Sequence, residues 1–316
     1  MPKALVLDQV HPDGVALLQA CAEAETVYLP APDDAAIARE IRDAEAIVLR
    51  ARVLSREVLD RAPKLRLISR HGVGCDNLDL PYLKSRGIAV AIAADSNYIS
   101  VAEQAFTLML AGCKRLVAAD AAVRSGNWDL RDNLNAREVM GASVLVAGFG
   151  RIGRAFAERA RAFGAHVTVY DPFMPEDAPL PNDVRRLTDL QQALAAADIV
   201  SLHMPRTPET AMLFNADRLQ QMKPGAILVN TARGGIVDET ALPAAFTEGR
   251  PAIYATDVLE QEPPRAGDPL LASDQLIVTP HSAAMTQEGA RRMATRSCQN
   301  VLDFFSDALD PDMVAG

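Results

Sequence analysis

Short apolar runs alternate with helix-forming segments through the first hundred residues. The runs that predict buried strands are 4–7, 47–49 and 67–69. Helical patterns are expected over 13–21, 32–43 and 55–61, and Ser55 is expected to be the N-cap of the last of these. Strands that alternate with helices in this way typically form a parallel sheet with helices on both faces.

A second alternating series follows a long helical pattern, which predicts one helix over about 100–122. Strands of this series are expected near residues 144, 167, 199, 227, 253 and 277. The segment 171–183 carries four prolines and is expected to be a surface loop. The segment 286–305 predicts a final helix, and the order of hydrophobic segments leaves open whether it returns to the first series.

A glycine-rich motif lies between the first two strands of the second series. It reads Gly148-Phe149-Gly150-Arg151-Ile152-Gly153, opens a helix-forming stretch, and is followed by a strand that ends at Asp171. The first glycine allows a tight turn, the second lets the backbone approach a pyrophosphate, and the third lets helix and strand pack closely. The phosphates then meet the positive end of the helix. The complete strand–turn–helix–strand–acid unit predicts a dinucleotide-binding domain.

Asp171 favours NAD over NADP as the dinucleotide. A carboxylate at this position accepts hydrogen bonds from both hydroxyls of the adenosine ribose and repels a 2′-phosphate. The next residues, Pro172 and Phe173, offer no arginine that would bind such a phosphate. The alternative interpretation is an acid that only caps a turn.

An arginine, an acid and a histidine each follow a strand of the second series. Arg233 lies in the segment 230–238, where it can hold a carboxylate by two parallel hydrogen bonds, or be a surface arginine beside a glycine turn. Glu262 and His281 follow the next two strands. Histidine is the natural proton donor near neutral pH, and a neighbouring carboxylate favours its charged form. Because ligands of parallel sheets bind at the carboxyl ends of strands, these three side chains predict a catalytic site.

The other four histidines are weaker candidates for acid/base chemistry. His11 and His166 are expected to be structural or exposed to solvent, whereas His71 and His203 lie in loops at strand ends. A lone histidine is more often structural than catalytic, so His281 is preferred because of the arginine and the acid that accompany it.

The first series has a candidate anion-binding loop at 69–79. Gly72 and Gly74 follow a buried strand, and backbone N–H groups exposed in such a loop can receive an anionic ligand. Arg50, at the end of another strand, can add positive charge. The alternative for Arg50 and Arg70 is a solvated or salt-bridged side chain. Cys75 is interpreted as a small apolar filler, because nothing in the sequence marks an activated thiolate.

Composition and charge restrict the classes of function. The 316 residues are 49% hydrophobic and carry a formal net charge of −9, which argues against non-specific nucleic-acid binding. The four cysteines have no metal-ligand spacing and are expected to be reduced thiols, so no metal site is predicted. Without a secretory signal or an apolar run near 18 residues, we expect a cytoplasmic protein that does not bind membranes.

Taken in order, these motifs resemble the D-isomer-specific 2-hydroxyacid dehydrogenases over nearly the whole chain. The loop at 70–79 is most similar to the phosphoglycerate dehydrogenase and hydroxypyruvate reductase branch. The other matching segments are 101–103, 148–153, 203–205, 230–238, 257–263 and 279–281. The resemblance implies a Rossmann NAD domain, 99–284, inserted in a flavodoxin-like substrate domain, 1–98 plus 285–316. It also implies a homodimer formed through the NAD domain near the long helix.

The resemblance further implies reversible, NAD-dependent reduction of a 2-oxo acid to a D-2-hydroxy acid. Arg233 would bind the substrate, His281 would be the acid/base, and Glu262 would pair with His281. Arg50 and the backbone at Val73 and Gly74 would hold the substrate. The positions implied to bind the cofactor are Gly148, Gly150, Arg151, Ile152, Gly153, Asp171, His203, Met204, Thr231, Ala232, Asp257, Ser282 and Ala283. Among these, Arg151 and Ile152 would meet the pyrophosphate and Asp257 the nicotinamide carboxamide.

Two alternatives stay open at this point. Phosphoglycerate-, hydroxypyruvate- and glyoxylate-like substrates all remain, and Arg50, Arg52 and Arg70 allow a second anionic group, phosphorylated or sulfonated, without requiring one. A different class is an NAD-sensing binding protein, because the dehydrogenase-like transcriptional corepressors share this fold and the same three residues. Oxidation of NADH by a small 2-oxo acid separates the two classes.

Overall fold

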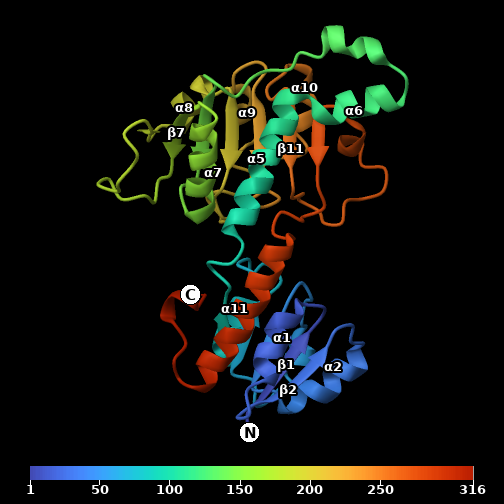
Figure 1. Cartoon of the computed structure of the whole chain (residues 1–316), viewed down its shortest axis with the longest axis vertical. Helices are drawn as coiled ribbons and strands as arrows, with labels where there is room; N and C mark the ends of the chain where they lie inside the picture. Colours follow the sequence, from blue (N-terminus) through green and yellow to red (C-terminus); the bar gives the residue numbers. More distant parts are fainter. Residues whose placement is uncertain (316) are drawn as a thin grey trace. The chain divides into compact units, whose positions relative to one another are not determined.

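The chain folds into two compact units, each built on one parallel β-sheet (Figure 1). The structure is a computed structural model and describes residues 1–315. The first unit contains Met1–Asn97 and the segment from Ala284 onwards, and Tyr98–Ala283 forms the second. The predicted α/β class with two doubly wound parallel sheets is therefore confirmed.

The sheet of the first unit has five strands in the order β2-β1-β3-β4-β5, all parallel. This is the flavodoxin-like order, in which the direction of winding reverses between β1 and β3. The loops that follow these two strands therefore flank the position where such sheets bind ligands. The strands are β1 (Lys3–Leu7), β2 (Glu25–Leu29), β3 (Ala46–Leu49), β4 (Leu67–Arg70) and β5 (Ala89–Ala91).

Alternate residues of each strand bury opposite faces of this sheet. Ala4 and Val6 pack under α1 (Pro12–Gln19) and α11 (Gln287–Phe305), whereas Leu5 and Leu7 face the other helices. Those are α2 (Asp34–Glu40), α3 (Arg56–Leu59), α4 (Leu80–Ser85) and the 3₁₀ turn η1 (Ile41–Asp43). A second 3₁₀ turn, η4 (Pro311–Met313), follows α11. The last helix of the chain thus lies beside the first (Figure 1). A Cβ at Gly14 would lie 2.6 Å from the carbonyl oxygen of Ala294, so glycine permits this close crossing.

The second unit has seven parallel strands in the order β12-β11-β10-β9-β6-β7-β8. This is the Rossmann order, with the winding reversed between β6 and β9. All six strands expected in this half are present, and the two-residue β8 was not predicted. The strands are β6 (Ser143–Ala147), β7 (His166–Tyr170), β8 (Arg185–Arg186), β9 (Ile199–Leu202), β10 (Ile227–Asn230), β11 (Ile253–Thr256) and β12 (Leu276–Val278).

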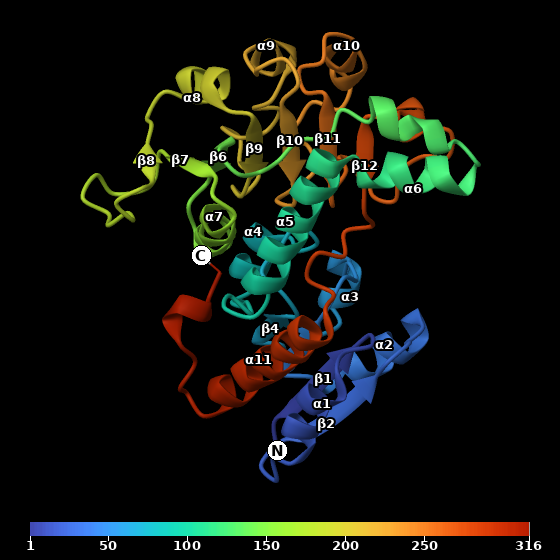
Figure 2. The same cartoon turned by 45° about the horizontal axis from the view of Figure 1, so that its top comes forward.

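Helices cover both faces of the seven-stranded sheet (Figure 2). Val144 and Val146 pack under α5 (Tyr98–Lys114) and α7 (Arg151–Ala162). Leu145 and Ala147, the alternate residues of the same strand, face the opposite helices. These are α8 (Leu190–Ala196), α9 (Ala216–Gln220) and α10 (Leu242–Thr247). The unit also contains two short 3₁₀ helices, η2 (Trp128–Asn133) and η3 (Pro269–Ala272).

The single long helix predicted over 100–122 is wrong. Helix α5 ends at Lys114, Arg115 adopts a left-handed conformation with φ 53°, and α6 (Leu116–Arg124) follows. No glycine or proline marks the break. The apolar periodicity continues into α6, but Leu116, Val117 and Val123 are exposed there, so the pattern does not reflect burial against the sheet.

Several smaller expectations are confirmed. Ser55 caps α3, since its side chain accepts a hydrogen bond from the Val58 N–H, and α11 is one continuous helix capped by Thr286. The loop at 171–183 contains no helix or strand, as expected.

All four cysteines are free thiols within the described residues. Among the described residues, no helix combines the length and apolar character needed to cross a bilayer.

Candidate active site

The glycine-rich motif forms the turn from β6 into α7 with each glycine under a different constraint. Gly148 has φ 94°, and a Cβ there would lie 2.7 Å from the carbonyl carbon of His203. A Cβ at Gly153 would lie 2.1 Å from the oxygen of Gly148, so only glycine lets α7 pack this closely. At Gly150 a Cβ would meet nothing within 4 Å. The open space at Gly150, at the positive end of α7, fits an approaching pyrophosphate.

Asp171 is connected to this turn by its carboxylate. One oxygen accepts the N–H of Phe149 at 2.8 Å, and the other accepts the N–H of Phe173 at 2.9 Å. A carboxylate has about four acceptor positions, so these two bonds leave capacity for ribose hydroxyls. The acid therefore caps a turn and also lies beside the glycine motif, and the two interpretations of Asp171 are compatible.

The loops after β9 and β10 contain buried polar atoms without a partner. Within residues 1–315, Nδ1 of His203 and Oγ1 of Thr231 are buried and accept or donate no hydrogen bond. Met204 and Ala232, their neighbours, are partly buried, whereas Arg151 is exposed at the start of α7 and Ile152 is half-buried. Because unsatisfied buried polar groups are unfavourable, these loops fit a bound group that supplies hydrogen bonds.

The Arg233 loop is held by the buried side chain of Asn230 at the end of β10. Its Oδ1 accepts the Ala232 N–H at 3.0 Å, and its Nδ2 donates to the Arg233 carbonyl at 2.9 Å. The hydroxyl of Tyr254 on β11 lies 3.2 Å from the same Nδ2. The guanidinium of Arg233 also donates to the Ala232 carbonyl at 2.7 Å. Asn230 thus fixes the turn that presents Arg233.

His281 and Glu262 form a direct pair. Nδ1 of His281 lies 2.7 Å from Oε2 of Glu262, and the other Glu262 oxygen accepts the N–H of Leu259 at 2.9 Å. Among the described residues no hydrogen bond involves Nε2 of His281, and the side chain is 52% exposed. A carboxylate on Nδ1 fixes the orientation of the imidazole and leaves Nε2 for a ligand.

Asp257 organises the backbone that carries His281. The carboxylate is 1% exposed and accepts the N–H groups of Ser282 and Ala283 at 3.0 and 2.8 Å. The Thr279 hydroxyl donates to the same carboxylate, and the Asp257 carbonyl accepts the His281 N–H at 2.8 Å. His281 has φ 49°, a left-handed conformation that a non-glycine residue adopts only when its surroundings enforce it. The contact of Asp257 with a nicotinamide stays a prediction.

The Arg233 loop and the Glu262 loop interlock at Gly234. A Cβ on Gly234 would lie 1.9 Å from the carbonyl oxygen of Leu259 and 2.8 Å from the nitrogen of Glu260. Strands β10, β11 and β12 are neighbours in the sheet, so the loops with Arg233, Glu262 and His281 leave the same edge. The structure therefore places these three predicted residues on adjacent strand ends within one unit.

Two of the other histidines are unsuited to donating protons. Burial lowers the pKa of His203 to about 3, and burial together with the charges of Arg50 and Arg70 lowers the pKa of His71 to about 4. Both are neutral near pH 7. His11 is the N-cap of α1, and His166 is exposed on β7. Of the five, only His281 is paired with a glutamate at the strand ends of the second unit.

In the first unit, Arg50 lies where the winding of the sheet reverses. It follows β3 and donates to the carbonyl of Gln9, in the loop after β1, at 3.1 Å. Val73, in the loop after β4, is 38% exposed, and Gly74 is half-buried. No group of histidine, cysteine or acidic side chains in residues 1–315 is arranged to hold a metal ion.

The two other arginines of this region are used within the unit. Arg52 pairs with Asp8 at 3.0 Å. Arg70 donates to Asn77 at 3.1 Å and to backbone carbonyls, including that of His71 at 3.1 Å. Arg70 is thus held by hydrogen bonds to an amide and to backbone carbonyls. Arg50 makes its contacts at the surface.

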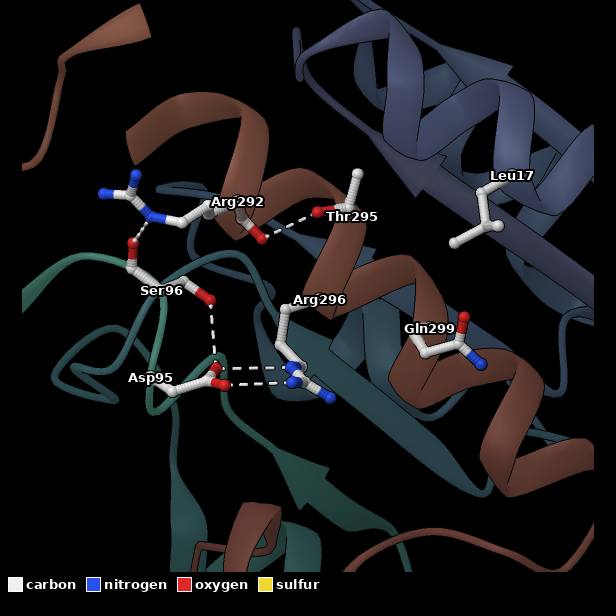
Figure 3. A pocket seen from close by; sticks show the side chains of 7 residues that line it. All are labelled: Leu17, Asp95, Ser96, Arg292, Thr295, Arg296 and Gln299. Carbon is white, nitrogen blue, oxygen red and sulfur yellow. Dashed lines mark hydrogen bonds and ion pairs between the residues drawn. The ribbon is translucent and has the colours of Figure 1, made fainter. Parts of the chain in front are cut away.

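A surface pocket of the first unit also contains arginines (Figure 3). Arg296 of α11 forms a bidentate ion pair with Asp95, in which Nη2 lies 2.9 Å from Oδ2. Arg292 donates from Nε to the carbonyl of Ser96 at 2.8 Å. These contacts attach α11 to the loop after β5. The charged side chains of this pocket therefore serve to hold α11 within the first unit.

Sequence reasoning did not assign roles to the residues that brace the site. Asn230, Gly234 and Glu239 lie inside or directly after the motif that contains Arg233, but in that motif the sequence predicted site roles only for Arg233, Thr231 and Ala232. Thr256, buried at the end of β11, lies 3.0 Å from the Asn230 carbonyl and 2.6 Å from that of Val258. A polar residue at the end of an otherwise apolar strand is the signal that could have identified Asn230 and Thr256.

Comparison with known proteins agrees with this architecture. The family model "D-isomer specific 2-hydroxyacid dehydrogenase, NAD binding domain" matches residues 106–283. A D-3-phosphoglycerate dehydrogenase of Methanocaldococcus jannaschii is 38% identical over 296 residues, 93% of this chain and 56% of its own length. A glyoxylate reductase of Thermofilum pendens is 37% identical over 320 residues, 99% of this chain and 94% of its own length.

A solved structure, the NADPH-dependent glyoxylate/hydroxypyruvate reductase of Sinorhizobium meliloti, superimposes with a TM-score of 0.86 and is 28% identical. It covers 100% of this chain and 98% of its own. The chain spans less than two thirds of the length of the phosphoglycerate dehydrogenases that it matches, at 56% for the methanogen protein. By sequence match and fold, the chain belongs to the D-isomer-specific 2-hydroxyacid dehydrogenase family.

Proposed function

We propose that the protein reversibly reduces a 2-oxo acid to a D-2-hydroxy acid with NADH. The observation that carries this proposal is the His281–Glu262 pair, at 2.7 Å, beside the arginine loop of a dinucleotide-binding unit. A proton donor, a carboxylate receptor and a hydride carrier are the three components that such a reduction needs. The second unit provides a proton donor, His281, and a carboxylate receptor, Arg233, on adjacent strand ends. Its glycine motif fits the dinucleotide that carries the hydride.

The residues of the chain have distinct roles in this proposal. Arg233 binds the substrate carboxylate and stabilises the negative charge that develops on the carbonyl oxygen. His281 donates its Nε2 proton to that oxygen, which becomes the hydroxyl. Glu262 holds Nδ1 and favours the charged imidazole before transfer. When bound, NADH supplies the hydride that adds to the carbonyl carbon. In the reverse direction, His281 removes the proton from the hydroxyl.

We assign cofactor binding to the second unit and substrate binding mainly to the first. The match of the NAD-binding family model to residues 106–283 supports the first assignment. The cofactor contacts are the positions named above from Gly148 to Ala283. Asp171 favours NADH, because a carboxylate beside the glycine motif repels a 2′-phosphate. Arg50, Val73 and Gly74 are assigned to the substrate.

The substrate that fits best is a small 2-oxo acid with one anionic group, such as glyoxylate or hydroxypyruvate. A phosphorylated or sulfonated substrate needs a second cationic site. Arg52 is paired with Asp8, and Arg70 is braced within its own loop. Of the three arginines considered for that role, only Arg50 then remains as a cationic group for a second anion, and it already donates to the Gln9 carbonyl at 3.1 Å. One such arginine favours a substrate with a single anionic group.

Two further features support a proposal for the oligomeric state and the compartment. Leu116, Val117 and Val123 on α6 are exposed apolar side chains, which supports a homodimer formed through the second unit. Four free thiols are typical of a reducing compartment, so we place the protein in the cytoplasm.

A substrate panel tests the proposed function. The kcat/KM of the purified protein is measured at fixed pH with glyoxylate, hydroxypyruvate and phosphohydroxypyruvate, each with NADH and with NADPH. We expect turnover with the two small acids, a lower kcat/KM with the phosphorylated acid, and a preference for NADH. NADH binding without oxidation by any 2-oxo acid would instead support the sensing class and contradict the enzyme.

Replacing Arg233 with lysine tests the carboxylate receptor. Lysine keeps the charge but cannot form two parallel hydrogen bonds, so we expect kcat/KM for the oxo acid to fall about 100-fold. The Kd for NADH, measured by fluorescence titration, should stay unchanged. Arg124→Lys, on the exposed face of α6, is the matched control and should retain full activity. An unchanged kcat/KM in the Arg233 variant would show that another group binds the carboxylate.

A further inference from the structure

Glu239 is an acid close to the proposed site that has no role in the scheme above. It lies between β10 and α10, six residues after Arg233. Its carboxyl is half-buried, and Oε1 accepts the N–H of Glu260 at 2.9 Å. Within residues 1–315 it forms no salt bridge. A half-buried acid without a cationic partner is unusual enough to need an explanation.

The single hydrogen bond of Glu239 connects it to the His281–Glu262 pair. Glu260 follows Leu259 directly, and the Leu259 N–H is held by Glu262 at 2.9 Å. Two successive N–H groups of one loop are therefore held by two different carboxylates. One of these, Glu262, contacts His281 at 2.7 Å. Glu239 thus fixes the main chain of the loop from which Glu262 reaches the histidine.

The surroundings of Glu239 are negatively charged. Burial is the main cause that raises the pKa of Glu239 to about 7, and the charges of Glu260, Glu262 and Asp268 raise it further. The hydrogen bond from the Glu260 N–H acts in the opposite direction. The carboxyl is therefore neutral in mildly acidic solution and ionised in mildly alkaline solution.

We propose that Glu239 is a positioning residue that holds the Glu262 loop and, when ionised, helps Glu262 to keep a proton on His281. This inference rests on the proposed function, because it concerns the same acid/base pair. An extra negative charge near Glu262 favours the imidazolium over the neutral imidazole. Glu239 ionises as the pH rises through neutrality, so its negative charge acts on the pair from neutral pH upwards. The proton-donating form then persists to higher pH.

The test compares two substitutions that separate charge from hydrogen bonding. Glu239→Gln keeps an oxygen that can accept the Glu260 N–H but removes the charge. Glu239→Ala removes both. Glu248→Gln, which neutralises an exposed acid at the end of α10, is the matched control. The ring of His281 is followed by NMR during a pH titration of each full-length protein, with the signal identified by its loss in His281→Gln.

We expect the titration midpoint of His281 in Glu239→Gln to move about 0.5 pH unit lower than in the unmodified protein. The basic limb of the pH profile of kcat/KM for oxo-acid reduction should move by the same amount, and the acid side should stay unchanged. Glu239→Ala should also lose about 10-fold in kcat at every pH, because the Glu260 N–H then lacks its acceptor. Glu248→Gln should change neither quantity.

An unshifted His281 midpoint in Glu239→Gln, or an equal shift in Glu248→Gln, would overturn the inference. Because the NMR titration needs no turnover, it is independent of the proposed function. A protein that oxidises no NADH but shows the shift would refute the enzyme and retain the coupling. A protein that turns over without the shift would refute the coupling alone. If Glu239→Ala does not fold, Glu239→Gln still decides, because its shape and its acceptor match the native side chain.

Discussion

Replacing His281 with glutamine should lower kcat for 2-oxo acid reduction by about 1,000-fold while the protein still binds NADH. The side chain of glutamine can hydrogen-bond to Glu262 but cannot donate a proton at neutral pH. General acid catalysis of this kind contributes on the order of 10²–10⁴ in rate. Steady-state kinetics at saturating NADH gives kcat, and fluorescence titration gives the Kd of the cofactor.

The matched control for this loss is His166→Gln. His166 is an exposed histidine on β7 of the same unit, so its replacement should leave kcat within about two-fold, as is usual for surface substitutions. The buried histidines are poor controls, because His203 packs on Phe156 at 5.0 Å between ring centroids. Turnover that survives in His281→Gln would show that the proton comes from another group or from water.

The sheets were predictable because their central strands are buried on both faces. Strand β3 is a continuous apolar run and β10 is apolar up to Asn230 at its end, which is the pattern typical of parallel sheets. The missed strands are short or lie at an edge. Strand β2 is only half-buried along its length, and β8 consists of Arg185 and Arg186. Their pairing depends on the neighbouring strand, and the local sequence does not encode it.

The break between α5 and α6 shows a different limit. Arg115 adopts a left-handed conformation that most residues avoid, and no residue type at this position indicates a helix break. The apolar side chains of α6 continue the helical period, although Leu116 and Val117 are exposed. Periodicity detects an apolar face but does not distinguish one that packs within the chain from one that is left uncovered.

The proposed catalytic residues were easier to predict than the residues that hold their loops in place. Arg233, Glu262 and His281 are reactive residue types that follow strands, so their positions alone predicted a common edge. The supporting contacts join residues that are distant in sequence, such as Glu239 to Glu260 and Asp257 to Ser282. The same holds for Arg52, whose partner Asp8 lies on the neighbouring strand end. Pairings of this kind depend on the folded geometry of two loops.

Gly234→Ala should be the most damaging substitution at this edge that removes no functional group. The added Cβ would lie 1.9 Å from the carbonyl oxygen of Leu259, where real contacts stay above 3.0 Å. The neighbour is backbone, so the two loops must separate by about 1 Å, and a displacement of that size at a catalytic site can lower the rate about 100-fold. We expect kcat/KM to fall by that factor, and thermal denaturation to show a loss of about 1–3 kcal/mol in stability.

A glycine elsewhere in the unit separates this displacement from a general effect of adding a methyl group. Gly249 has φ 64° and open space around it, so Gly249→Ala strains only its own backbone, by about 1–2 kcal/mol. It should lower the melting temperature as Gly234→Ala does, yet keep kcat/KM near the native value. If both variants lose stability and neither loses activity, the Arg233 and Glu262 loops do not depend on each other for position. If only Gly234→Ala loses activity, contact between these loops sets the geometry of Arg233 and Glu262, because no charged or hydrogen-bonding side chain has changed.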